Sequence, residues 1–95
     1  GAAMPRYLVE RTFTDQLNLP VPGQDPSVRL QFIENNALDG VTWVFSYVVP
    51  EHNKSYCICE ADTPEAVRRA ARRNQLPIDR IVEVLGLDPY GFSSV

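Results

Sequence analysis

The stretch VTWVFSYVVPEHNKSYCICEA (residues 41–61) decides the fold of this chain. Residues 41–49 and 54–61 are rich in β-branched, aromatic and small apolar side chains, which favour β-strands. The four residues between them, Pro-Glu-His-Asn, are typical of a turn. The stretch therefore predicts a β-hairpin. Neither arm has a polar face, so we expect both sides of the sheet to be covered.

One strand and one helix are predicted before the hairpin. Residues 7–13 (YLVERTF) predict a central strand, because apolar side chains fall on both of its faces. Asp25 followed by Pro26 predicts a helix start, since Asp caps free N–H groups and proline suits the first position. The helix is expected to end at residue 36 or 38. Its buried stripe should comprise Leu30, Ile33 and Ala37, flanked by Val28 and Phe32.

A second helix and a last strand are predicted after the hairpin. Thr63 is a good helix cap, Pro64 suits the first helical position, and Glu65 favours the positive end of the helix dipole. Residues 79–87 (DRIVEVLGL) predict the last strand. The tail at residues 88–92 is expected to turn away with two aromatic side chains that are available to a neighbouring chain.

The order of these elements, β-α-β-β-α-β, predicts an α+β fold of the ferredoxin-like type. Right-handed connections then place both helices on one face of a four-stranded antiparallel sheet. We expect residues 4–95 to form this single domain and residues 1–3 to be the remnant of an expression tag. The other face of the sheet, called the open face below, has no covering element.

The two sheet faces can be assigned from strand alternation and side-chain size. Beneath the helices we expect the smaller residues Val44, Val48, Cys57, Cys59, Ala61, Val82 and Val84. On the open face we expect Trp43, Phe45, Tyr47, Tyr56 and Ile58, together with Glu10, Glu60 and Glu83. Monomers rarely leave so much contiguous apolar area in water, so the sequence predicts a homodimer through the open sheet face.

The open face is also the predicted site. The expected ligand-binding residues are Trp43, Tyr47, Tyr56, Glu60 and Glu83. Three carboxylates on neighbouring strands, Glu10, Glu60 and Glu83, would bind a divalent metal or have raised pKa values, because isolated buried charge is costly. The only histidine, His52 in the turn, is a further candidate metal ligand. Alternatively, each glutamate pairs with Arg6, Arg11 or Arg80 or lies at the rim of the face, and the histidine is an exposed bystander.

Cys57 and Cys59 point to the same face of their strand and are poorly placed for a mutual disulfide. We expect reduced thiols beneath the helices, with a metal-binding or redox pair as the alternative. The second helix carries four arginines away from its buried stripe, which predict a solvated face or, alternatively, an anion-binding patch. These are Arg68, Arg69, Arg72 and Arg73.

The composition argues against two classes of partner, nucleic acids and membranes. The net charge of −3 argues against a nucleic-acid-binding face. No apolar run approaches the ~20 residues that a membrane-spanning helix needs, so we expect a cytoplasmic protein without a membrane partner.

Five motifs together carry a family resemblance. They are YLVERTF at 7–13, WVFSYV at 43–48, YCICEA at 56–61, the Arg-rich helix through Arg73, and LPIDRIVEV at 76–84. In this order the chain resembles a family of small bacterial ferredoxin-like nickel-binding proteins, formerly a domain of unknown function. The resemblance implies a ferredoxin-like homodimer that binds Ni²⁺ or another divalent metal. The family pattern carries a histidine where this chain has Ala70 and an aromatic residue where it has Cys59.

Three functions are compatible with these observations. The favoured hypothesis is a small dimeric ligand-binding protein, with a divalent metal such as nickel or a small ligand between the two sheets. The alternative is a cofactor-free dimeric α/β-barrel enzyme, of the isomerase or oxygenase type, with Glu60 or Glu83 as base. The third is an interaction module without a ligand. Fold alone does not choose among them.

Overall fold

A computed structural model describes residues 4–14, 26–49 and 53–93 of the chain. The predicted hairpin turn, with His52, lies mostly outside these residues. The elements are β1 (Arg6–Thr12), α1 (Pro26–Leu38), β2 (Thr42–Val49), β3 (Lys54–Glu60), α2 (Pro64–Asn74), β4 (Arg80–Val84), β5 (Gly86–Asp88) and β6 (Gly91–Ser93). None of the helices in the described part of the chain is long and apolar enough to cross a membrane.

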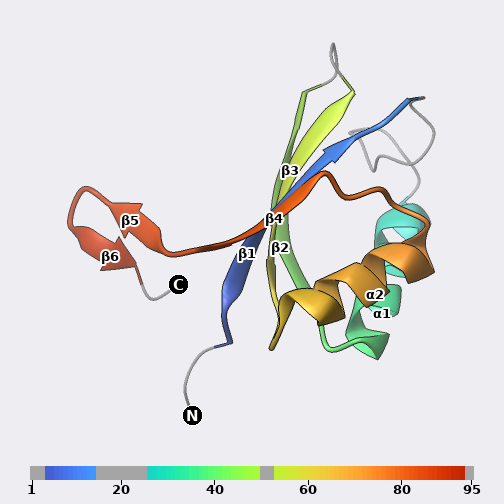
Figure 1. Ribbon diagram of the computed structural model, residues 1–95, viewed down its shortest axis with the longest axis horizontal. Helices are drawn as coiled ribbons and strands as arrows, with labels where there is room; N and C mark the ends of the chain where they lie inside the picture. Colours follow the sequence, from blue (N-terminus) through green and yellow to red (C-terminus); the bar gives the residue numbers. More distant parts are fainter. Residues whose placement is uncertain (1–3, 15–25, 50–52, 94–95) are drawn as a thin grey trace.

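Strands β1 to β4 form one sheet in the order β2-β3-β1-β4, and each neighbouring pair is antiparallel. Both helices lie on the same face of this sheet (Figure 1). The predicted α+β architecture of two helices on a four-stranded antiparallel sheet is therefore confirmed. The predicted central strand, β1, pairs with β3 on one side and β4 on the other.

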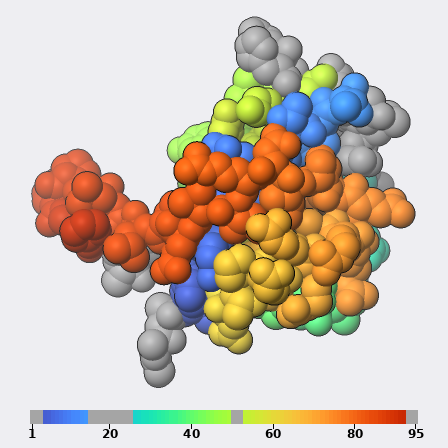
Figure 2. Space-filling model, in the orientation of Figure 1, coloured from blue at the N-terminus to red at the C-terminus, as the bar shows by residue number. Residues whose placement is uncertain are grey.

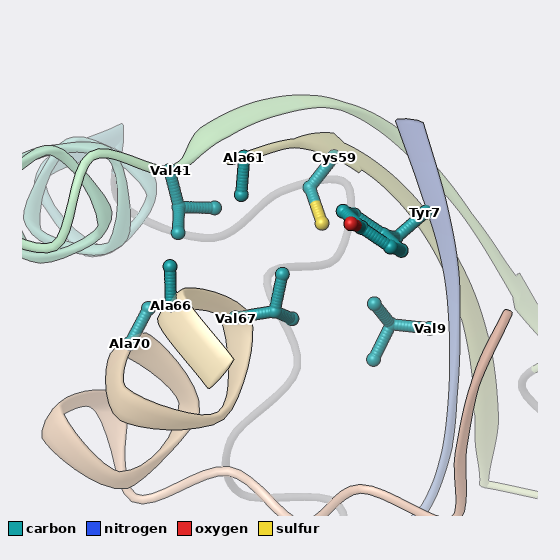
Figure 3. Close-up of a cluster of buried hydrophobic side chains, with 8 residues drawn as sticks. All are labelled: Tyr7, Val9, Val41, Cys59, Ala61, Ala66, Val67 and Ala70. Carbon is teal, nitrogen blue, oxygen red and sulfur yellow. The ribbon is translucent and has the colours of Figure 1, made fainter. Parts of the chain in front are cut away.

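The core lies between the sheet and α2. Tyr7 and Val9 of β1 and Cys59 of β3 point toward Val67 and Ala70 of the helix (Figure 3). Alanines on the inner side of α2 let the helix lie close to the sheet. The start of α2 follows local chemistry, because the Thr63 hydroxyl accepts a hydrogen bond from the Ala66 N–H at 3.2 Å.

Polar side chains link helix α1 to α2. The Asn35 amide donates to Asn74, which donates in turn to Asn36, both at 2.9 Å. Asp39 accepts from Arg73 at 3.0 Å and lies 3.8 Å from Arg69. The Arg73 guanidinium lowers the pKa of the Asp39 carboxyl. All four arginines of α2 are exposed, as expected for a solvated face, and two of them pair with Asp39 just beyond the end of α1.

The buried stripe predicted for α1 is wrong. Leu30, Ile33 and Ala37 are exposed, and α1 has no fully buried residue. The helix is turned so that Phe32 and Asn36 face the sheet and α2. The hydrogen bonds between the asparagines fix this rotation, and apolar periodicity could not reveal them.

Strand pairing confirms part of the face assignment. Residues directly opposite each other in an antiparallel pair share a face. Tyr47 lies opposite Tyr56, and Phe45 lies opposite Ile58, away from the helices. Glu10 lies on the same face, opposite Tyr56. Cys57, Cys59, Ala61 and Val48 lie on the helix side, as predicted.

Two site residues, Trp43 and Glu83, were assigned to the wrong face. A bulge in β2 places Trp43 opposite Cys59 and Phe45 opposite Ile58, so the tryptophan turns toward the helices. Glu83 lies opposite the buried Tyr7 and is likewise on the helix side. Three valines were also misassigned. Val82 and Val84 face the open side, and Val44 is an exposed residue at the bulge.

The predicted last strand ends at Val84, and the chain then forms a small separate hairpin, β5–β6. This hairpin, called the arm below, projects away from the sheet and helices (Figures 1 and 2). Its side chains and the residue before it are strongly exposed: Leu85 78%, Leu87 70%, Tyr90 99% and Phe92 74%. The tail therefore turns away as expected, and its packing on a neighbouring chain stays a prediction.

Candidate functional site

The open face has aromatic side chains at its β2 edge and charged side chains, among them Arg6, Glu10 and Glu60, along β1 and β3. The Phe45 and Tyr47 rings meet edge to face, with centroids 5.2 Å apart, and both rings are exposed. The Lys54 ammonium lies 6.0 Å from the Tyr56 ring centroid. Of the predicted ligand-binding aromatic residues, Tyr47 and Tyr56 lie on this face, whereas Trp43 does not.

The predicted carboxylate cluster is not assembled within one chain. Glu60 accepts a hydrogen bond from the Arg6 guanidinium at 3.0 Å, which confirms the alternative that it is paired. Glu10 lies opposite Arg80 of β4. It is four residues along β1 from Arg6, the partner of Glu60, so roughly 13 Å of strand separates Glu10 from Arg6. Glu83 lies on the helix side of the sheet, opposite Tyr7. The pKa of Tyr7 is raised mainly by burial and further by the negative charge of Glu83. Among the described residues, no three His, Cys, Asp or Glu side chains gather as metal ligands do.

A cavity of about 130 Å³ lies on the other side of the sheet, between the strands and the helices. Most of its wall is apolar and includes Phe13, Phe32, Val48 and Val67. Its polar lining comes from five side chains: Arg11, Asn36, Ser46, Ser55 and Asn74. Only part of this polar lining is paired within the wall.

Arg11 is the unusual member of the cavity wall. Alternation along β1 places it on the inner face, between Val9 and Phe13, and only 8% of its surface is exposed. Its Nε atom is buried and has no hydrogen-bond partner in the described part of the chain. Ser55, which is also buried, lies directly opposite on β3. The cavity therefore contains a buried cation that no described carboxylate balances.

The remaining polar atoms of the cavity are better satisfied. The Trp43 indole N–H donates to the Ser46 hydroxyl at 2.9 Å. The Cys57 thiol donates to the Ser55 hydroxyl at 3.8 Å. Burial raises the pKa of the Cys59 thiol to about 11, although the nearby Arg11 charge opposes this shift. At neutral pH Cys59 is a protonated thiol. Both cysteines are free, as expected, but only Cys59 is buried and Cys57 is half-buried.

Sequence reasoning missed this cavity and treated Arg11 only as an ion-pair partner. A signal was present, because Arg11 interrupts the inner face of β1 that Tyr7, Val9 and Phe13 otherwise keep apolar. Ala70 and Cys59, the two positions where the chain departs from the family pattern, both line the cavity. The space itself depends on how α1 packs, which no sequence pattern showed.

Comparison with known proteins agrees with the resemblance. A family described as nickel responsive protein SCO4226-like matches residues 7–84. The chain belongs to this family. The crystal structure of SCO4226 from Streptomyces coelicolor A3(2) is similar, with a TM-score of 0.57 and 19% identity over 83% of this chain and 94% of that one. At this identity the likeness shows the fold alone. The search of curated proteins gave no match.

The donor atoms that the described residues of one chain offer do not fit nickel well. The closest pair of soft ligands, Cys57 and Cys59, includes a thiol whose raised pKa disfavours the thiolate that a metal needs. Arg11 also places a positive charge beside that thiol. The open-face carboxylates are separate from each other, as described above. Among the described residues, one copy of the chain therefore provides no complete nickel site.

Proposed function

We propose that this chain is a ferredoxin-like homodimer with a ligand-binding, nickel-related role, and that it is not an enzyme. The family to which the chain belongs is named for nickel response. The observation that carries the proposal is the set of exposed apolar side chains on the arm and at the β2 edge of the open face.

The arm lacks a core of its own. Its strands have three residues each, and a two-stranded hairpin is marginally stable in water without packing. Leu87 and Phe92 lie opposite each other and so share a face, yet both are exposed. A second copy would cover this face and the aromatic edge of β2.

The exposed apolar area is large enough for a stable dimer. Six large side chains contribute to it: Phe45, Tyr47, Leu85, Leu87, Tyr90 and Phe92. With about 150–250 Å² for each aromatic side chain, the exposed parts of the four aromatic residues amount to on the order of 600 Å² per copy, and the two leucines add to this area. A standard protein interface buries ~800 Å² per partner. The partner we propose is a second copy, because one two-fold axis would bury both faces identically.

Nickel would then bind between two copies. Because one copy lacks a complete donor set among its described residues, we propose that each copy contributes carboxylates from the open face. Glu10 comes first, and Glu60 would use Oε1, since Arg6 binds its Oε2. His52 stays a proposed ligand, since imidazole is a good nickel donor. Glu83 is not proposed again, because it lies on the helix side.

The enzyme alternative has no observation in its favour. It required Glu60 or Glu83 to act as a base beside the open-face aromatic residues. The Glu60 carboxylate is engaged by Arg6, and Glu83 lies behind the sheet. Neither residue is placed to take a proton from a ligand that lies on the aromatic residues of the open face.

Calorimetric titration with nickel tests this function on protein purified without a metal-affinity step. We expect saturable binding by the wild type and weaker binding by Glu10→Gln. Glu34→Gln is the matched control, because Glu34 is exposed on α1, on the helix side of the sheet. Absence of saturable heat from the wild type, or equal loss in the control, would show the nickel assignment to be wrong.

A further inference from the structure

We infer that the cavity between the sheet and the helices binds a small apolar carboxylate, whose anionic end pairs with the Arg11 guanidinium. The site lies on the helix side of the sheet, opposite the face assigned to the second copy. This inference therefore stands or falls independently of the dimer and of nickel.

The charge in the cavity indicates the chemical class of the ligand. Burying a cation without a partner is costly, and arginine residues are rarely this buried unless they are paired. Arg11 is more than nine-tenths buried, and none of the ion pairs among the described residues includes it. Its orphaned Nε is a donor already removed from water. A guanidinium matches a carboxylate with two parallel hydrogen bonds, so a carboxylate would supply what the site lacks.

Neighbouring groups extend the same preference. The Ser55 hydroxyl lies across from Arg11 and can donate a second hydrogen bond to an anion. Cys57 and Cys59 also line the cavity, but a metal cation bound to them would lie beside the Arg11 charge. Repulsion between two positive charges in a poorly solvated space disfavours a metal and favours an anion.

The rest of the cavity limits the size and polarity of the ligand. Its volume of about 130 Å³ is comparable to the ~150 Å³ of an engineered apolar cavity that takes up benzene. Phe13, Phe32 and Val48 form an apolar wall, which suits a hydrocarbon body. The structure therefore favours an aromatic or branched acid with a single ring or a short chain.

Helix α1 provides a route of access to the cavity. This helix has no fully buried residue, and its asparagines attach it to α2. An element with few buried apolar contacts opens at low cost relative to global unfolding. A ligand can therefore enter without disturbing the core beneath α2.

Benzoate and its neutral analogue benzamide are suitable probes. Trp43, the only tryptophan of the chain, lines the cavity and reports occupancy by fluorescence. We expect benzoate to change this fluorescence saturably. Benzamide should bind at least about tenfold more weakly, because it cannot form a charge-assisted hydrogen bond with the guanidinium. Equal binding of the two probes, or no response to benzoate at millimolar concentration, would overturn the inference.

Three variants localise the effect. Arg11→Met should weaken benzoate binding by about tenfold or more, whereas Arg6→Met, on the open face, should leave it unchanged. Ala70→Leu fills the cavity without touching the charge and should also reduce binding. If a variant does not fold, shifts of the Ser55 and Arg11 amide signals on benzoate titration of the wild type provide the same test. Binding that survives both Arg11→Met and Ala70→Leu, or amide shifts confined to the open face, would place the ligand elsewhere.

Discussion

Replacing Arg11 by methionine should make the protein more stable, although the wild-type residue lies in the central strand. Arg11 is 8% exposed, and its buried Nε is unsatisfied in the described structure. An unsatisfied buried donor costs about 1–3 kcal/mol, more if charged, and methionine occupies similar length without a donor. We expect the free energy of unfolding to rise by about 1–2 kcal/mol. For a domain of this size that corresponds to an increase in Tm of about 4–8 °C per kcal/mol.

Urea denaturation, followed by far-UV circular dichroism on ligand-free protein, measures this change. Arg6→Met is the matched control, since it removes a partly exposed ion pair with Glu60 and should cost about 0–1 kcal/mol. If Arg11→Met lowers the denaturation midpoint, the guanidinium must be well satisfied in the native protein. The reasoning that assigns an anion to the cavity would then be refuted.

Three further predictions concern stability. Val67→Ala should lower the free energy of unfolding by about 2–3 kcal/mol, because Val67 is 2% exposed in the core. The control Val28→Ala, on the exposed side of α1, should change it by less than ~1 kcal/mol. Equal urea midpoints for the two variants would contradict the packing described. Thr63→Ala should cost about 1 kcal/mol by removing the cap on the Ala66 N–H, whereas Thr63→Ser should retain it; similar losses in both variants would argue against the cap. Raising the pH should destabilise the fold through Cys59, whose thiol has a pKa of 9.0 when exposed and about 11 in the native state. The unfolded chain therefore loses the thiol proton first, and the free energy of unfolding should fall by about 2 kcal/mol between pH 9 and 11. Urea midpoints should fall less steeply over this range in Cys59→Ala, and parallel profiles would rule out the cysteine as the cause.

Local chemistry made much of the fold predictable. Pro26 and Pro64 start the two helices where expected, and Thr63 caps the second one, because these signals act over a few residues. The hairpin followed from its composition. The bulge that turns Trp43 inward was not visible, because it depends on the register between β2 and β3, which composition does not set. The rotation of α1 was missed for a similar reason, since it depends on Asn74 of another helix.

The site was less predictable than the fold. Gathering Glu10, Glu60 and Glu83 required the register between strands, and the observed register moves Glu83 behind the sheet. Conversely, Arg11 alternates with Val9 and Phe13, so its inward direction was available from the sequence. Its lack of a partner was not, because only the folded chain shows which acidic residues lie near it. Strand alternation therefore predicts the direction of a side chain better than it predicts the hydrogen-bond or ion-pair partners of that side chain.

The most direct test of the proposed function is the mass of the chain in solution. Sedimentation equilibrium at micromolar concentration should give twice the 10.7 kDa of one chain. The double variant Leu87→Asp, Phe92→Asp places charges on the exposed face of the arm and should sediment as a monomer with an unchanged far-UV spectrum. A wild-type mass of 10.7 kDa across the concentration series would contradict the homodimer and, with it, a nickel site shared between two copies.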